Sequence, residues 1–441
     1  MKEKQVFNNA KWIILCKILQ SLLQLVIGMI SARYLGPSNY GLINYAASIV
    51  AFAMPIMKLG FDATLVYELV NSPEKGGEIV GTSLFMNVLS SLACMGGVFT
   101  FVSLTNFGQT EVILVCLLYS FSLFFGAIEM IQYWFQYKLM SKHSSLTMLF
   151  SYFGVSIYKI FLLITQKNVL WFAVSHAVEF GLIGIILLIL YKRNNGAKFS
   201  VSTSRMKSML SRSKHYILAS LMLVIIQNTD HIMLTAIVGS SETGFYSAAI
   251  TCVTMLQFVY IAIVDSFRPY ILEEKKISNQ SYEKSLMRVN SITLYLSIAQ
   301  CIVFFVLADF IVLVLYGKDY AASAQVIRVL SFYFIFSLMG LLRNVWILAE
   351  NKQKYLFVIN LSGALLNILL NSFMIPLFGA SGAAAASFIT QFFANFVLGF
   401  IIKPLRRNNY LIVKSLNPVF FFAEVKNIVN IILKKEQKTS V

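Results

Sequence analysis

The sequence contains little charge for its length of 441 residues. Only 12% of the residues are Asp, Glu, Lys or Arg, about half of the roughly 25% that is typical of a soluble globular domain. A soluble chain of this length would fold into about two or three domains with polar surfaces, and this composition cannot cover such surfaces. The shortage of charge therefore excludes a soluble enzyme, a disordered chain and a soluble domain held by a single membrane anchor.

Cysteine is also scarce, and the five cysteines all lie inside apolar runs. No two of them form a Cys-x-x-Cys pair and none lies beside a His at metal-ligand spacing, which excludes a disulfide scaffold and a zinc site. The chain also lacks a GxxxxGK[ST] phosphate loop, a DxD motif and an HExxH motif. We interpret the cysteines as small apolar packing residues, and we expect no metal or organic cofactor.

Apolar residues make up 58% of the chain, and they are gathered in runs long enough to cross a bilayer. A transmembrane helix needs about 20 mostly apolar residues, and only helices or closed barrels satisfy their backbone hydrogen bonds in lipid. Runs of this length are too long for barrel strands. The sequence therefore predicts an all-α membrane protein with twelve transmembrane helices, at about 12–34, 41–59, 79–104, 111–135, 145–166, 168–191, 215–238, 244–267, 290–315, 324–349, 355–377 and 382–402.

Basic residues outnumber acidic residues by 36 to 19, and they gather in the short gaps between the apolar runs. With a cytoplasmic N-terminus, 28 of the 36 Lys and Arg residues fall in cytoplasmic segments, and only Lys167 and Lys318 fall in outer loops. This bias is typical of membrane topology, so we do not interpret the basic excess as a nucleic-acid surface. We expect both termini in the cytoplasm and the first apolar run to be an uncleaved span.

The longest inner loop is basic and lies near the midpoint of the chain, which suggests two halves. Shifting 11–50 by 203 residues onto 214–253 gives nine identities, where composition alone gives roughly three. We predict a parallel duplication, with the substrate site between the repeats. In the tail, the one-sided apolar pattern of 418–433 predicts an interfacial helix. The predicted segments are an N-terminal six-helix lobe (1–191), a basic linker (192–213), a C-terminal six-helix lobe (214–402) and a cytoplasmic tail (403–441).

The first predicted helix carries a continuous polar stripe on one face. A stripe of this length is not tolerated against lipid, so we expect it to face protein or water. The functional interpretation is a wet transport passage, and the alternative is a helix–helix seam joined by small and amide residues. The stripe consists of Lys17, Gln20, Ser21, Gln24, Gly28 and Ser31.

Further polar residues lie deep in the predicted membrane. Asp230 is well inside the seventh predicted helix, and Asn367 and Asn371 lie one turn apart on the eleventh. A carboxylate at this depth must be protonated, paired with a cation or bound to one. These three residues are candidates for coupling to Na⁺ or H⁺. The alternative is a structural hydrogen-bond network or a salt bridge to a basic residue on another helix.

Several basic residues also lie within the predicted spans, and Lys159 and Arg343 are the most deeply placed. A charge at mid-bilayer costs at least about 2.5 kcal/mol, so each one needs a partner or a ligand. Glu129, Glu179 and Asp309 are candidate partners for the basic residues in the spans. Cations left without such a partner in one cavity would attract a multiply anionic headgroup, and Arg is suited to phosphate oxygens.

Three segments carry a resemblance to a known family: ARYLGPSNYGLINYAASI at 32–49, LYGKDYAASAQVIRVLS at 315–331, and NLSGALLNILLNSFMIPLFGASGAAAAS at 360–387. With twelve predicted spans and a basic loop at the midpoint, the chain resembles the polysaccharide flippases of the multidrug/oligosaccharidyl-lipid/polysaccharide exporter superfamily. These motifs lie in turns and packing faces. They therefore indicate the family better than the cargo.

The resemblance implies a non-enzymatic flippase in the bacterial cytoplasmic (inner) membrane. Its expected cargo is an undecaprenyl-pyrophosphate-linked oligosaccharide, an O-antigen or capsule repeat unit, which it moves from the inner to the outer leaflet by alternating access. Lys17, Arg343 and Lys159 would bind the pyrophosphate, and Gln20 and Gln24 would contact sugar hydroxyls. The expected partners are this lipid-linked oligosaccharide, membrane lipids and the glycan polymerase machinery.

Two other functions fit the same architecture. A cation-coupled exporter of drugs or small molecules would use the same fold, although a cavity for cationic drugs should be acidic and aromatic. A membrane-embedded enzyme of glycan assembly would need an active site for which the sequence shows no motif.

Overall fold

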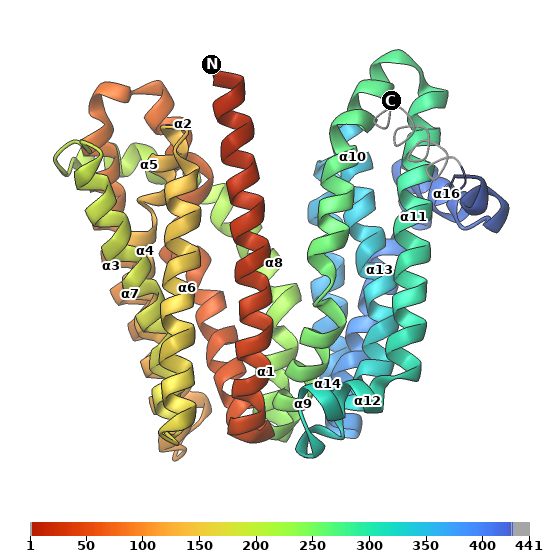
Figure 1. The fold of residues 1–441 in the computed structure, drawn as a ribbon, viewed down its shortest axis with the longest axis horizontal. Coiled ribbons are helices and arrows are strands. Elements are labelled where there is room, and N and C mark those ends of the chain that lie inside the picture. Colours follow the sequence, from red (N-terminus) through yellow and green to blue (C-terminus); the bar gives the residue numbers. More distant parts are fainter. Residues whose placement is uncertain (1, 425, 427–441) are drawn as a thin grey trace, which may run out of the picture. The chain divides into compact units, whose positions relative to one another are not determined.

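The computed structural model describes residues 2–424 and 426, without the side chains of residues 2–11, 14, 219 and 223. Within these residues the chain forms α-helices, short 3-10 segments and one π-helix, and no β-strand (Figure 1). The prediction of an all-α protein is confirmed. This is the fold expected of a chain whose apolar runs must satisfy their own backbone hydrogen bonds in lipid.

Nine helical stretches among the described residues are long and apolar enough to cross a membrane. The helices Thr203–Met222 and Val224–Val238 meet at a bend of 46°, and the count is ten if this pair forms one span. Two of the nine are much longer than one crossing and contain a break. The break lies at Gly36 in one and at Gly379 in the other, where the backbone is not helical. Both glycines lie between two predicted spans, and α1 reverses direction in Figure 1. The multi-pass architecture is confirmed, and the count of twelve stays a prediction.

The chain divides into two compact units. The first comprises the described part of Met1–Ala248 together with Leu315–Tyr320, and the second comprises the described part of Ala249–Val314 and Ala321–Val441. This division follows packing rather than the proposed repeat, because α8 packs against α1 within the first unit. The predicted boundaries of the lobes and linker therefore stay predictions.

The first unit contains the elements up to α8, the start of α9 and the segment η2. Their bounds are α1 (Lys2–Met57), α2 (Phe61–Asn71), η1 (Pro73–Lys75), α3 (Gly76–Thr105), α4 (Thr110–Glu129), α5 (Gln132–Tyr137), α6 (Ser141–Ile164), α7 (Val169–Arg193), α8 (Thr203–Val238), α9 (Ser240–Thr254) and η2 (Lys318–Tyr320).

The second unit contains the rest of α9 and the elements that follow it. Their bounds are α10 (Gln257–Ile277), α11 (Asn279–Val306), α12 (Ala308–Leu315), α13 (Ser323–Ala349), α14 (Lys354–Phe392), the π-helix η3 (Phe393–Val397), α15 (Leu398–Ile401), η4 (Lys403–Leu405) and α16 (Arg406–Ser415).

The basic linker is fastened to the first unit by ion pairs. Arg205 donates from Nε to Glu78 Oε1 at 2.9 Å and lies 3.8 Å from Glu68. Arg212 donates to the other oxygen of Glu68 at 2.9 Å. Glu68 is only 5% exposed, so its charge needs these two partners. The start of α8 is therefore held against α2 and α3.

The predicted interfacial helix of the tail lies only partly within the described residues. Residues 418–424 are helical, while 427–433 lie outside the described residues. In the second unit, Phe421 stacks on Tyr295 with ring centroids 4.1 Å apart, and Glu424 accepts a hydrogen bond from Arg288 at 2.5 Å. The first part of this helix is therefore docked on α11.

Candidate functional site

A polar cavity of about 340 Å³ lies beside Lys17 in the first unit. It is formed by the segment of α1 from Ile13 to Gln20, by α5 and by the start of α6. Among the described residues that line it, Lys17 is the only charged one and none is a carboxylate. The lining residues are Ile13, Cys16, Lys17, Gln20, Gln132, Gln136, Ser141, Ser144, Ser145 and Met148.

The short helix α5 supplies two amides to this cavity because Gln132 and Gln136 are one helical turn apart. Gln132 donates to Glu129 at 2.9 Å, and Glu129 is paired with Lys58 at 3.6 Å. The carboxylate that binds Gln132 is therefore already engaged by another cation. The positive charge of Lys17 has no ion pair among the described residues.

Hydroxyl groups complete the polar wall. Ser144 is 8% exposed, and its Oγ is buried without a hydrogen-bond partner. A buried hydroxyl without a partner is costly, and rotation of this side chain toward the cavity would let the hydroxyl bind a group there. Lys142 lies near the same end of α6, with its Nζ 4.3 Å from the centre of the Trp12 ring. One cation, six hydroxyl or amide side chains and an aromatic neighbour suit an anion linked to hydroxyl-rich groups.

The structure brings together two of the five residues predicted to bind the cargo. Lys17 and Gln20 line the polar cavity, and Gln24 is exposed one turn further along α1. Lys159 also lies on α6, 11 residues beyond Met148, which places it about 16 Å further along the helix axis. Its Nζ is 6.0 Å from the ring centre of Tyr152. Lys17 and Lys159 therefore lie at different levels.

Arg343 belongs to the second unit and is 3% exposed. Its Nη1 donates to the carbonyl oxygen of Ala394 at 2.8 Å, and its Nε has no partner. Ala394 lies in the π-helix Phe393–Val397. Such bulges change the local hydrogen-bond pattern and are frequent at functional sites. No ion pair of Arg343 is present in the described part of the chain.

The three candidate coupling residues lie in different units. Asp230 is 3% exposed and accepts a hydrogen bond from the Tyr246 hydroxyl at 2.5 Å in the first unit. The His231 ring lies edge-on to Tyr246 at 5.1 Å. In the second unit Asn371 donates to Asn367 at 3.0 Å, which is the contact expected of residues one turn apart on one helix.

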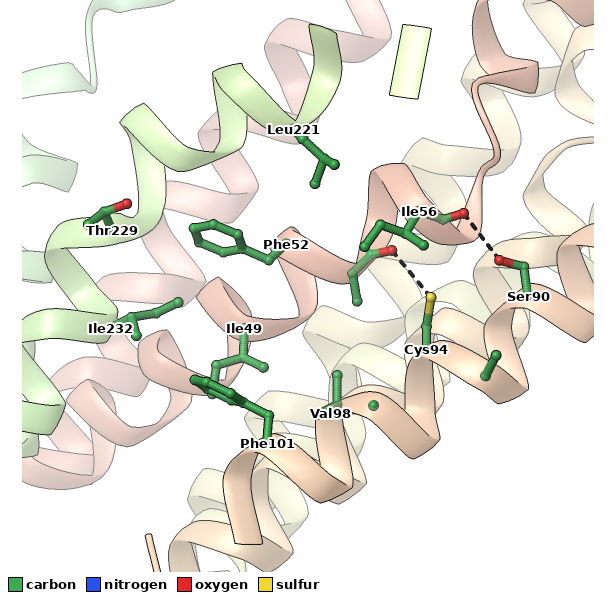
Figure 2. A pocket seen from close by; sticks show the side chains of 13 residues that line it. Ile49, Phe52, Ile56, Ser90, Cys94, Val98, Phe101, Leu221, Thr229 and Ile232 are labelled. Atoms are coloured by element: carbon green, nitrogen blue, oxygen red, sulfur yellow. Dashed lines mark hydrogen bonds between the residues drawn. The ribbon is translucent and has the colours of Figure 1, made fainter. Parts of the chain in front are cut away.

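A second cavity of about 640 Å³ lies in the first unit between α1, α3 and α8 (Figure 2). Its polar side chains are turned back onto helix backbones. Ser90 donates to the Ile56 carbonyl at 3.1 Å, and Cys94 lies 3.7 Å from the Ala53 carbonyl. Water in a cavity needs about two to four polar partners, and this wall offers hydrocarbon. The cavity is therefore unsuited to a phosphate or a sugar.

Sequence reasoning missed the two glutamines of α5. The spacing of four residues in QYWFQY puts both on one face, and this was the signal that could have identified them. The aromatic residues around them concealed the pattern. Trp134, in the same segment, is 5% exposed and packs on Tyr191 with ring centroids 4.7 Å apart.

The chain is similar to known proteins in sequence and in fold. The family model described as polysaccharide biosynthesis protein matches residues 6–275. The capsular polysaccharide biosynthesis protein CapF of Staphylococcus aureus is 22% identical over 405 residues, covering 88% of this chain and 96% of the relative.

Two solved structures share the fold over most of their length. An inward-facing multidrug resistance MATE family transporter of the MOP superfamily has a TM-score of 0.68 at 13% identity, covering 89% of this chain and 95% of that one. The lipid II flippase MurJ in an inward closed conformation has a TM-score of 0.65 at 16% identity, covering 97% and 99%. At these identities the likeness shows the fold alone.

Proposed function

The chain belongs to the polysaccharide biosynthesis protein family, and from this premise we propose that it is a flippase for a lipid-linked oligosaccharide. It moves an undecaprenyl-pyrophosphate-linked O-antigen or capsule repeat unit from the inner to the outer leaflet of the bacterial cytoplasmic membrane. The cargo leaves chemically unchanged, so the protein is a transporter rather than an enzyme. In this proposal twelve helices form two six-helix lobes, and both termini are cytoplasmic.

One observation carries the proposal. The described residues that line the polar cavity beside Lys17 supply one positive charge, no carboxylate, and amide and hydroxyl groups. A pyrophosphate joined to a sugar presents negative charge next to hydroxyl groups, which is the complementary arrangement. In the proposed topology, this end of α1 faces the cytoplasm, where the cargo is assembled. Lys17 binds the pyrophosphate, and Gln20, with Gln24 beyond it, contacts sugar hydroxyls.

The other two proposed pyrophosphate ligands act later in the passage. Lys159 lies about 16 Å from the cavity along α6, so one headgroup contacts Lys17 and Lys159 in sequence rather than together. Arg343 is buried in the second unit with a free Nε. It takes up the phosphate only after its side chain leaves Ala394.

Coupling to an ion gradient is assigned to Asp230, with Asn367 and Asn371 as further oxygen ligands in the second unit. A buried carboxylate bound by a tyrosine hydroxyl at 2.5 Å can exchange that neutral partner for a proton or Na⁺. Alternating access then requires the two lobes to move while the lipid tail stays in the bilayer. We also propose that the polymerase machinery takes up the product at the outer leaflet.

The test is deletion of the gene, followed by measurement of lipid-linked repeat units on each leaflet. We expect accumulation on the cytoplasmic leaflet and loss of surface glycan. Complementation with Lys17→Ala should restore little surface glycan. Lys138→Ala is the matched control, because Lys138 is exposed at the end of α5 and does not line the cavity.

A deletion strain with normal surface glycan and increased drug sensitivity would contradict the proposal and favour a multidrug exporter. The cavity argues against that function, because a site for cationic drugs needs acidic groups and the residues that line this one include none.

A further inference from the structure

Two turns in the first unit begin with a glycine in a similar backbone conformation, although they lie 203 residues apart. Gly36 has φ 70° and ψ 170°, and Gly239 has φ 102° and ψ 169°. This region of backbone space is essentially restricted to glycine. Each glycine begins a turn that ends at a second glycine five residues later, Gly41 and Gly244. The two turns correspond to each other in the predicted duplication.

The two turns also meet in a reciprocal contact. A Cβ on Gly41 would lie 1.8 Å from the carbonyl oxygen of Ser240, and a Cβ on Gly244 would lie 2.0 Å from the carbonyl oxygen of Pro37. Ser240 is the 203-residue counterpart of Pro37, and Gly244 is that of Gly41. Exchanging the repeats therefore maps the contact onto itself. This is the signature of a two-fold axis.

A tyrosine from a third segment holds the two turns together. Tyr320 is fully buried, and its hydroxyl donates to the carbonyl oxygen of Ala32 at 2.8 Å. Its ring lies edge-on to Tyr40 beside the first turn and to Phe245 beside the second, with both centroid distances 6.3 Å. Burial, with Asp319 and Tyr40 nearby, raises the pKa of Tyr320, so the hydroxyl keeps its proton and remains a donor.

We propose that the glycine contact and Tyr320 form the outer seal of the translocation passage, which opens once in every transport cycle. This inference rests on the proposed function, because it places these turns at the outer face. Between the turns, the side-chain hydroxyls of Ser38 and Ser240 share a hydrogen bond, with oxygens 3.0 Å apart.

Such a contact suits a surface that separates and closes again. The glycines let two backbones meet closely, so backbone packing itself excludes water and ions where Gly41 meets Ser240 and Gly244 meets Pro37. The alternative is a permanent packing seam between the first helices of the two repeats. The two interpretations differ in whether a covalent link across the turns stops transport.

The first experiment joins the turns. Cysteines placed as Ser38→Cys and Ser240→Cys start from oxygens 3.0 Å apart, within the range that a disulfide needs after small adjustment. We expect oxidation to cross-link the double variant and to stop glycan export, and reduction to restore export. Each single-cysteine variant is a control for the five native cysteines. A cross-linked protein that exports at the wild-type rate would overturn the seal.

The second experiment separates the two turns by a steric clash. Gly41→Ala puts a methyl group where the Ser240 oxygen now lies, whereas Gly28→Ala on the same helix meets nothing within 4 Å. A reporter cysteine at Gln24 is labelled from outside with a membrane-impermeant maleimide. We expect labelling to be several-fold faster in the Gly41→Ala variant than in the Gly28→Ala variant. Equal rates in two variants with equal thermal stability would contradict the seal.

The labelling experiment uses no cargo, so it separates the two proposals. If deletion of the gene leaves surface glycan unchanged, the proposed function fails, and the labelling rates still decide whether the turns form a seal.

Discussion

Replacement of Arg343 by methionine separates a structural role of this residue from a role in transport. The guanidinium is 3% exposed, and it has one hydrogen bond, to Ala394, and no ion pair in the described chain. A charged side chain at the centre of a membrane helix costs about 2.5 to 3.5 kcal/mol on insertion scales. A hydrogen bond from a charged group stabilises the folded state by about 1.5 to 3 kcal/mol. The arginine therefore costs the folded protein between about zero and 2 kcal/mol.

Methionine has a similar length and no charge, so Arg343→Met should leave the free energy of unfolding unchanged or raise it by up to about 2 kcal/mol. Thermal unfolding in detergent should show no decrease in melting temperature and an increase of at most a few degrees. Surface glycan in the complemented deletion strain should nevertheless fall to the level of the empty vector. A protein that becomes more stable while it loses transport carries a charge kept for function.

Arg328→Met is the matched control on the same helix, because Arg328 is paired with the exposed Asp309. It should retain transport and change stability by less than about 1 kcal/mol. Wild-type export by Arg343→Met would refute the pyrophosphate role. A melting temperature lower by more than about 5 °C, together with lost export, would instead show that Arg343 mainly caps the π-helix.

Three further predictions concern other charged groups of the described chain. Glu68→Gln removes the carboxylate shared by Arg205 and Arg212. Limited proteolysis should therefore cut the 192–213 linker several-fold faster than in Glu74→Gln, a control at an exposed glutamate. An unchanged cleavage rate would show that these ion pairs do not hold the linker in place. Asp230→Asn should leave the protein folded but make export in vesicles independent of an applied proton or Na⁺ gradient, and retained dependence would remove Asp230 from coupling. Lys58 and Glu129 form an ion pair, and their side chains are 22% and 13% exposed. A double-mutant cycle with Lys58→Met and Glu129→Gln should give a coupling energy of about 0.5 to 3 kcal/mol in thermal unfolding. A value near zero would show that the pair does not contribute to stability.

The sequence predicted features that depend on local pattern. Apolar runs specify which segments cross the membrane, and Gly36 and Gly379 separate consecutive runs because only glycine adopts the required backbone there readily. Two of the acidic residues considered as partners, Glu129 and Asp309, do pair with the intramembrane cations Lys58 and Arg328. A charge in a span has few neighbours that can satisfy it, so composition limits the choice.

The arrangement of the site could not be predicted in the same way. The amides of α5 face Lys17 because three helices pack at particular rotations, which no single helix pattern determines. The π-helix that receives Arg343 is a departure from regular helical geometry, and the sequence shows no glycine or proline within it.

The hydrogen bond from Tyr320 to Ala32 has a consequence for biosynthesis, because its partners are 288 residues apart in the chain. Ribosomes add roughly 5 to 20 residues each second. The interval between the synthesis of Ala32 and that of Tyr320 is therefore on the order of 15 to 60 seconds. During that interval the early helices are already in the bilayer with an unfinished end. Chaperones or insertases that cover this end would act in that interval, and a truncated chain lacking Tyr320 would stay in the unfinished state.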